Sequence, residues 1–145
     1  MSIAQVVATR SKDPNTQVGA VIVDQENCIV STGYNGMPTG CSDDEFPWER
    51  EAKHPNDTKY PYVCHAELNA ILSAGSKLYG HTLYTTLFPC NECAKAIIQS
   101  GISTIIYKEN LYPDSNSTLA SQVMLEAAST DIVKFEGRSL QEITK

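Results

Sequence analysis

Short apolar runs alternate along the chain with segments of helical periodicity. Apolar runs bounded by polar turns predict strands at residues 18–23, 28–30, 82–86, 104–107 and 132–135. Apolar positions at helical spacing predict helices at residues 3–8, 66–74, 91–100 and 119–128. Two of these helices are followed by glycine, which is a common residue just past the end of a helix. The polar turn between the first two strands predicts a hairpin.

The order of these elements predicts the fold class. The order is helix, strand, strand, helix, strand, helix, strand, helix, strand. Strands that alternate with helices favour a sheet that is parallel in its second half, with right-handed crossovers. We therefore expect an α/β fold: a three-layer α/β/α sandwich built on a mixed five-stranded sheet. The length of 145 residues fits one domain over residues 1–145.

Residues 36–62 form a long segment without a convincing period. The segment contains four prolines, and it is longer than the roughly 12–15 residues at which irregular connections become unusual in compact domains. Its aromatic side chains predict that at least part of it packs against something: Phe46, Trp48, Tyr60 and Tyr62. We favour a lid or a subunit contact over a purely ornamental surface loop.

Charge and hydropathy narrow the range of partners. Eleven Lys and Arg against seventeen Asp and Glu give a net charge of −6, which argues against binding of a nucleic acid polymer. A small anionic substrate needs only a local group of donors, so a nucleotide remains allowed. No apolar run approaches the ~20 residues of a membrane span, and residues 1–5 lack the features of a secretory signal. We expect a soluble, cytoplasmic protein with no membrane partner.

The cysteines and one histidine suggest a metal site. Cys90 and Cys93 stand three residues apart at the start of a predicted helix, so both sulfurs face the same side, and the helix N-terminus favours thiolate charge. His65, 25 residues before Cys90, starts a neighbouring helix and completes a set of three zinc ligands. Three protein ligands leave one tetrahedral position open for water, as in catalytic zinc sites.

The other cysteines are expected to have no metal role. The total of five is odd and argues against a disulfide framework. We expect Cys28 in the core, Cys41 in the long loop, and Cys64 beside the site without a metal. A bare CxxC pair taken alone is as often a structural zinc knuckle or a pair of buried thiols as part of a catalytic site.

Glu67 adds a carboxylate to this group. It follows His65 by two residues, so it projects toward the same cleft without being in line to act as another ligand. A carboxylate beside an activated water can act as general base, which implies hydrolysis of an amidine-like carbon with release of ammonia. The pattern matches the H-x-E…P-C-x-x-C signature of zinc-dependent nucleobase deaminases. A non-catalytic, zinc-stabilised nucleotide-binding module is a competing interpretation, but it has no need for Glu67.

Several motifs resemble the deoxycytidylate (dCMP) deaminases of the cytidine deaminase superfamily. They lie at residues 10–20, 33–38, 40–44, 60–67 and 88–95. The resemblance implies a cytidine deaminase-like fold and conversion of dCMP to dUMP and ammonia, which supplies the precursor of thymidylate. It also implies zinc on His65, Cys90 and Cys93, with Glu67 as the proton shuttle. The nearest rival is a deaminase of another base or carrier, such as cytidine, guanine or adenosine in transfer RNA.

The same resemblance suggests the residues that bind the substrate. Asn35 would contact the sugar, with an amide that can both donate and accept hydrogen bonds. The backbone N–H of Ala66, at a helix start, would donate to the carbonyl of the base. Arg10, Lys12 and Tyr112 are the expected contacts of the monophosphate.

Regulation and assembly also follow only from the resemblance. Members of this type are hexamers that dCTP activates and dTTP inhibits, usually with Mg²⁺. The effector would bind at residues 35–44, with Asn35, Gly36, Asp43 and Asp44 as the candidate residues. Paired acids in a loop are more often simply solvated.

Overall fold

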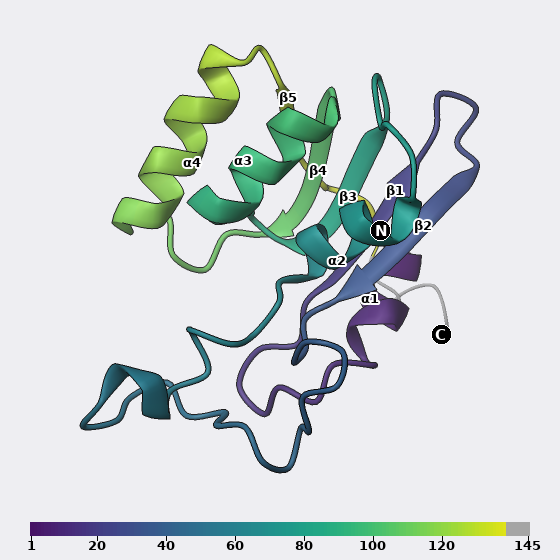
Figure 1. Ribbon diagram of the computed structural model, residues 1–145. Coiled ribbons are helices and arrows are strands. Elements are labelled where there is room, and N and C mark those ends of the chain that lie inside the picture. The colour runs from purple at the N-terminus through teal and green to yellow at the C-terminus, as the bar shows by residue number, and fades with distance from the viewer. Residues whose placement is uncertain (139–145) are drawn as a thin grey trace.

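The computed structural model describes residues 1–138 as a mixed sheet covered by helices on both faces (Figure 1). The strands are β1 (Gly19–Val23), β2 (Ile29–Tyr34), β3 (Thr82–Leu87), β4 (Thr104–Glu109) and β5 (Asp131–Lys134). The helices are α1 (Ser2–Ala8), α2 (Ala66–Ala74), α3 (Asn91–Ser100) and α4 (Asn116–Ala127), with a short 3₁₀ turn η1 (Pro55–Asp57). The predicted order of elements and the predicted fold class are confirmed.

The sheet has the strand order β2-β1-β3-β4-β5. Strand β1 pairs antiparallel with both β2 and β3, whereas β3, β4 and β5 run parallel to one another. The parallel pairs are joined through α3 and α4, as expected for βαβ crossovers. The prediction that the second half of the sheet is parallel is therefore confirmed.

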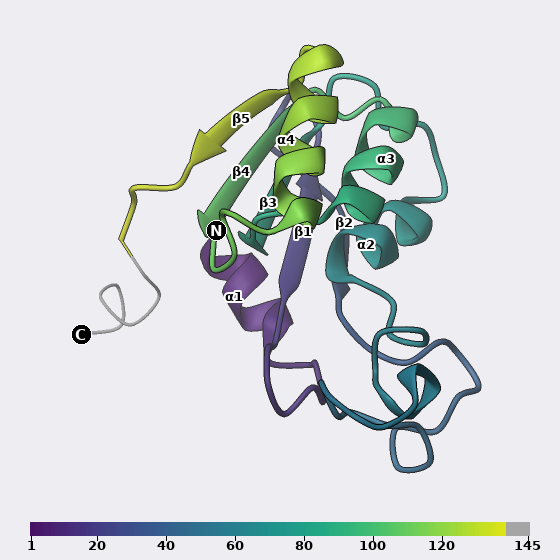
Figure 2. The ribbon, with the colours of Figure 1, turned by 90° about the vertical axis from the view of Figure 1, so that its left-hand side faces the viewer.

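Both faces of the interior strand β1 are buried, so its sequence is apolar at every position except one glycine. Ala20 and Ile22 face the larger core, which they share with α2, α3 and α4. Val21 and Val23 face the other side, where Ala4 of α1 covers them. Figure 2 shows α1 on the opposite side of the sheet from α2 and α3. The three layers are therefore α1, the sheet, and the group α2, α3 and α4.

The long loop, defined here as residues 36–63, lies at the end of the sheet where β1 begins and β2 ends (Figures 1 and 2). Part of it packs, as predicted. The rings of Phe46 and Tyr62 meet edge to face at 5.2 Å, and Trp48 Nε1 donates a hydrogen bond to the Asp43 carbonyl at 2.9 Å. Its role as a lid or subunit contact stays a prediction.

Cys28 corrects one expectation. It is exposed and precedes β2, instead of lying in the core. The reason is local: Asp24 Oδ1 accepts hydrogen bonds from the N–H groups of Glu26 and Cys28, which extends the hairpin turn up to Cys28. Within residues 1–138, no helix combines the length and apolar character needed to cross a membrane. One domain over residues 1–145 stays a prediction, and residues 139–145 lie outside the described part.

Two glycines set how closely helices approach the sheet. A Cβ on Gly33 would come within 2.2 Å of the Ala66 carbonyl oxygen and 2.3 Å of the Ala70 nitrogen, both in α2. A Cβ on Gly19 would come within 2.0 Å of the Ala4 carbonyl oxygen in α1. In both cases the clashing atoms belong to a helix backbone, so the helix would have to move to make room for a Cβ. Each glycine therefore allows one helix to pack at its observed distance from the sheet.

We predict that Gly33→Ala and Gly19→Ala each lower the free energy of unfolding by about 2 kcal/mol through overpacking. Only Gly33→Ala shifts α2, which begins directly after His65. It should therefore also reduce zinc content, which Gly19→Ala should leave unchanged. Urea unfolding and metal analysis of the two purified variants test this. Equal loss of zinc in both would contradict the separate roles of the two helices.

Candidate active site

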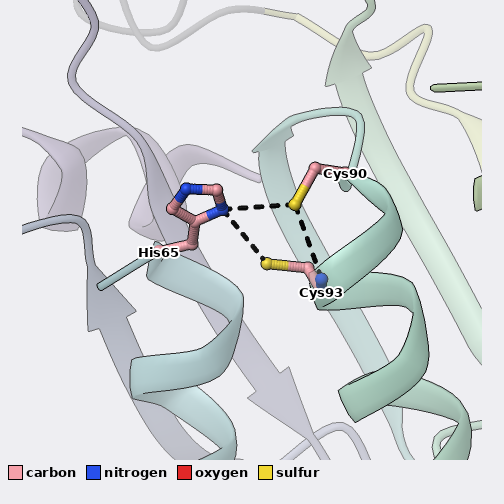
Figure 3. A group of neighbouring side chains, drawn as sticks. All are labelled: His65, Cys90 and Cys93. Carbon is pink, nitrogen blue, oxygen red and sulfur yellow. Dashed lines mark hydrogen bonds between the residues drawn. The ribbon is translucent and has the colours of Figure 1, made fainter. Parts of the chain in front are cut away.

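His65, Cys90 and Cys93 come together at the starts of two helices (Figure 3). His65 is the N-cap of α2 and Cys90 is the N-cap of α3, with Cys93 in the first turn. His65 Nδ1 lies 3.3 Å from Cys90 Sγ and 3.4 Å from Cys93 Sγ. Among residues 1–138 this is the one cluster of His, Cys, Asp and Glu whose ligand atoms converge to within 4.8 Å.

The donor set fits a zinc ion. Zn–S bonds of about 2.3 Å and Zn–N bonds of about 2.05 Å at tetrahedral angles separate a sulfur from a nitrogen by about 3.6 Å. The two observed N–S distances, 3.3 and 3.4 Å, need only a small expansion to reach that value. One imidazole and two thiolates leave a fourth position for a ligand that the protein does not supply.

The cluster already favours thiolate charge. The pKa of Cys90 is lowered to about 4, because its sulfur accepts hydrogen bonds from the Cys93 thiol, the His65 ring and the Cys93 backbone N–H. The hydrogen bond to Cys90 raises the pKa of His65. Cys93 has a raised pKa, since its thiol donates to Cys90 and it is buried. The sulfur at the helix N-cap therefore carries the first negative charge of the site.

Glu67 lies beside this cluster in the first turn of α2 and is only 4% exposed. Its Oε1 accepts a hydrogen bond from Thr85 Oγ1 of β3 at 3.0 Å, and its Oε2 lies 3.4 Å from Cys93 Sγ. Burial raises the pKa of the carboxyl group. A carboxyl group in this setting holds a proton more readily than an exposed glutamate does.

A cavity of about 950 Å³ opens onto the cluster, which is large enough for a nucleotide. Seven predicted site residues line it: Asn35, His65, Ala66, Glu67, Cys90, Cys93 and Tyr112. Ala66 is the first residue of α2, a position whose N–H has no partner within the helix.

The remaining predicted residues lie elsewhere. Of the residues that the structure describes, Arg10, Lys12, Gly36, Asp43 and Asp44 are not among those lining this cavity. The Arg10 guanidinium lies over the Tyr34 ring at 5.5 Å, and Lys12 Nζ pairs with Asp43 Oδ2 at 2.8 Å on the surface.

Two cationic residues of the long loop reach the cavity and were not predicted. Arg50 Nη2 donates a hydrogen bond to Tyr112 Oη at 2.7 Å, so the loop meets the segment after β4 across the cavity wall. Lys59 Nζ is buried against Asp13 Oδ2. Neither residue lies in a segment with a periodic pattern. The only signal in the sequence that the long loop packs was its aromatic residues.

Asp13 and Asn35 form a buried polar network with Lys59. Burial by itself would raise the pKa of the Asp13 carboxyl, but hydrogen bonds from Lys59 and from the N–H groups of Asn15 and Thr16 outweigh it and lower the pKa. Asn35 Nδ2 donates to Asp13 Oδ2 at 3.3 Å. The network connects the segment before β1, the end of β2 and the long loop.

A histidine and two thiols beside a buried carboxylate, at helix starts on one edge of this sheet, form the arrangement of a zinc-dependent deaminase. The chain belongs to the cytidine and deoxycytidylate deaminase family, since residues 1–109 match the cytidine and deoxycytidylate deaminase zinc-binding region.

Within that family the curated relatives include deoxycytidylate deaminases. The protein from Pongo abelii is 55% identical over 136 residues, which cover 93% of this chain and 76% of the relative. The protein from Enterobacteria phage T4 is 36% identical, with 75% of each chain covered. A solved dCMP deaminase from cyanophage S-TIM5, in complex with dCMP and dUMP, is 25% identical with a TM-score of 0.71, covering 92% of this chain and 91% of that one. The resemblance inferred from the sequence is confirmed.

We predict that Cys90→Ser removes most of the bound zinc, because a hydroxyl at the N-cap of α3 does not supply a thiolate ligand. Cys64→Ser is the matched control. Cys64 directly precedes His65 but is no part of the cluster, so this variant should keep its zinc. Metal analysis of both purified proteins tests this. Loss of zinc from Cys64→Ser, or full zinc in Cys90→Ser, would contradict the assignment of the ligands.

Proposed function

We propose that the protein hydrolyses dCMP to dUMP and ammonia. One observation carries the proposal: the buried Glu67 carboxylate lies beside the His65, Cys90 and Cys93 cluster in a cavity of nucleotide size. The curated deoxycytidylate deaminases that share more than half of their aligned residues with this chain support the choice of substrate. Supply of dUMP for thymidylate synthesis is the corresponding metabolic role.

His65, Cys90 and Cys93 would hold the zinc ion. Zinc held there would supply Lewis-acid chemistry, which makes a water molecule acidic enough to attack at neutral pH. The Thr85 hydroxyl donates to Oε1 of Glu67, whereas Oε2 lies 3.4 Å from Cys93 Sγ, beside the group that would hold the zinc ion. Once the Cys93 sulfur is a thiolate ligand it no longer donates to Oε2, which would then be the oxygen that exchanges a proton.

Glu67 is the proton carrier in this mechanism. It accepts a proton from the attacking water and gives it to the ring nitrogen next to the reacting carbon. In the second half it transfers the remaining water proton to the exocyclic amine, which leaves as ammonia while the water oxygen stays as the new carbonyl. The raised pKa of the buried carboxyl suits a group that must hold the proton between the two transfers.

Other residues of the cavity orient the nucleotide. The N–H of Ala66 would donate to the carbonyl of the base, and Asn35 would bind the sugar. For the phosphate we propose Tyr112 together with Arg50, because their side chains are hydrogen-bonded on the cavity wall and an arginine matches phosphate geometry. Arg10 and Lys12 are the competing contacts, and they stay predictions.

Regulation by dCTP and dTTP, with Mg²⁺ on the effector and assembly as a hexamer, belongs to the same proposal. The backbone around Gly36 supports a link between the effector loop and the metal site. Gly36 and Cys64 exchange two N–H to carbonyl hydrogen bonds of 3.0 and 2.8 Å, and Cys64 directly precedes His65. Asp43 is held by Lys12, and Asp44 is exposed. A cytoplasmic location stays a prediction.

Ammonia release from dCMP, deoxycytidine and CMP, each with and without dCTP, tests the proposal. We expect dCMP to be the preferred substrate and dCTP to raise its rate at low substrate concentration. Equal turnover of deoxycytidine would contradict a phosphate site. No turnover of any of them would favour a deaminase of another base or a non-catalytic nucleotide-binding module.

Glu67→Gln should reduce kcat on dCMP by about a thousandfold while zinc content stays the same, because the amide cannot carry a proton. Glu126→Gln, the same change on an exposed position of α4, is the matched control and should leave kcat unchanged. Rates and metal content of both variants are the measurement. An active, zinc-loaded Glu67→Gln enzyme would refute the proton-carrier role.

Arg50→Ala should raise KM for dCMP by about tenfold or more, since a charge-assisted hydrogen bond to phosphate is lost. The KM for deoxycytidine, which has no phosphate, should change by less than about twofold. Steady-state kinetics on both substrates, run in parallel with Arg10→Ala and Lys12→Ala, decide between the two assignments. If only Arg10→Ala or Lys12→Ala raises KM selectively for dCMP, Arg50 is not a phosphate contact.

A further inference from the structure

The side-chain amide of Asn35 is held by partners on both of its ends. Its Oδ1 accepts a hydrogen bond from the Val18 N–H at 2.7 Å. Its Nδ2 donates to Asp13 Oδ2 at 3.3 Å and to the Thr16 carbonyl at 3.0 Å. An amide nitrogen has two hydrogens and an amide oxygen has two lone pairs. The one remaining capacity of the Asn35 amide is therefore the second lone pair of Oδ1.

Asp13 contributes to this orientation together with the Val18 N–H and the Thr16 carbonyl, and it is itself held in place. It is 3% exposed. Its Oδ1 accepts hydrogen bonds from the N–H groups of Asn15 and Thr16 at 2.8 and 3.2 Å, so its Oδ2 faces Lys59 Nζ and Asn35 Nδ2. A carboxylate only accepts hydrogen bonds. The Asn35 amide therefore presents nitrogen, not oxygen, to Asp13.

We propose that Asp13 is a positioning residue that keeps the Asn35 oxygen available to the substrate, so that Asn35 accepts a hydrogen bond and cannot donate one. This inference rests on the proposed function, in which Asn35 binds the sugar. A deoxyribose that is phosphorylated on C5′ has a single free hydroxyl, on C3′. Asn35 thus selects nucleotides whose 3′-hydroxyl can donate a proton to it.

The test compares dCMP with 2′,3′-dideoxycytidine 5′-monophosphate, which lacks only that hydroxyl. We expect the full-length zinc-loaded enzyme to prefer dCMP in kcat/KM by about tenfold, the value of one hydrogen bond. Asp13→Asn keeps the shape of the side chain and the Oδ1 atom that accepts from Asn15 and Thr16. Its Oδ2 is replaced by an NH₂ group, which donates hydrogen bonds. The new NH₂ group repels Asn35 Nδ2, so the preference in kcat/KM for dCMP over the dideoxy compound should fall to about twofold or less.

A second variant separates positioning from the loss of charge. Asp13→Asn leaves Lys59 buried without its anion, which lowers stability. The double variant Asp13→Asn with Lys59→Met removes that cation and should recover much of the stability, yet still lack the preference. If the preference for dCMP returns in the double variant, the unpaired Lys59 caused its loss, and the proposal is overturned.

Asp24→Asn is the matched control. Asp24 Oδ1 also accepts two backbone N–H hydrogen bonds in a turn, but this turn belongs to the β1–β2 hairpin, and within residues 1–138 Asp24 is not among the residues that line the cavity. This variant should keep the full preference for dCMP. Equal loss of the preference in Asp24→Asn and Asp13→Asn would show a general effect of a weakened turn and would overturn the role of Asp13.

The outcomes separate this inference from the proposed function. No ammonia from dCMP in the unchanged enzyme would refute the proposed function itself. Equal kcat/KM for dCMP and the dideoxy compound would leave the deaminase activity standing and refute the sugar contact. A full preference retained in Asp13→Asn would leave both the activity and the sugar contact standing and refute the positioning role.

Discussion

The site depends on two helices that begin at the same edge of one sheet. Helix α2 packs against β1 and β2, whereas α3 follows β3, the neighbour of β1 on its other side. His65 and Cys90 cap these two helices, so the strand order that places the helices side by side also brings the imidazole and the sulfur together. The backbone N–H groups at the start of α3 stabilise charge on the sulfur. The same two elements position Glu67, which lies in the first turn of α2 and accepts a hydrogen bond from Thr85 of β3.

Much of this arrangement could be predicted from sequence because it is local. Strand and helix positions follow from periodicity, and α2 and α3 end at glycines with left-handed backbone, Gly75 and Gly101. Metal ligands follow from spacing, since residues three apart in a first helical turn share a side. Even the buried β1 was visible as a continuous apolar run. Some bounds differ: α4 begins three residues before the predicted start, at Asn116. At Cys28 a hydrogen-bonded turn, which hydropathy does not report, ends one residue later than the apolar run suggests.

The remaining parts of the site depend on contacts between distant segments, which periodicity does not report. Lys59 meets Asp13 across 46 residues, and Arg50 meets Tyr112 across 62. A buried lysine can be recognised only when its carboxylate partner is known. The resemblance assigns the phosphate to the basic segment at residues 10–12, an assignment that stays a prediction, and in the structure Arg10 stacks on Tyr34 and Lys12 pairs with Asp43. Both Arg10 and Lys12 therefore contact partners outside the described lining of the cavity.

The backbone bridge between Gly36 and Cys64 closes the long loop at its base. Because the bridge holds the two ends of the loop together, the length of the tip can change without disturbing the base. The entropic cost of closing the loop grows only slowly with the number of residues added. Insertions or deletions near the exposed turn at residues 51–57 would thus change the reach of the loop without moving its base. A change in the length of the tip would therefore leave the metal site at the base of the loop intact.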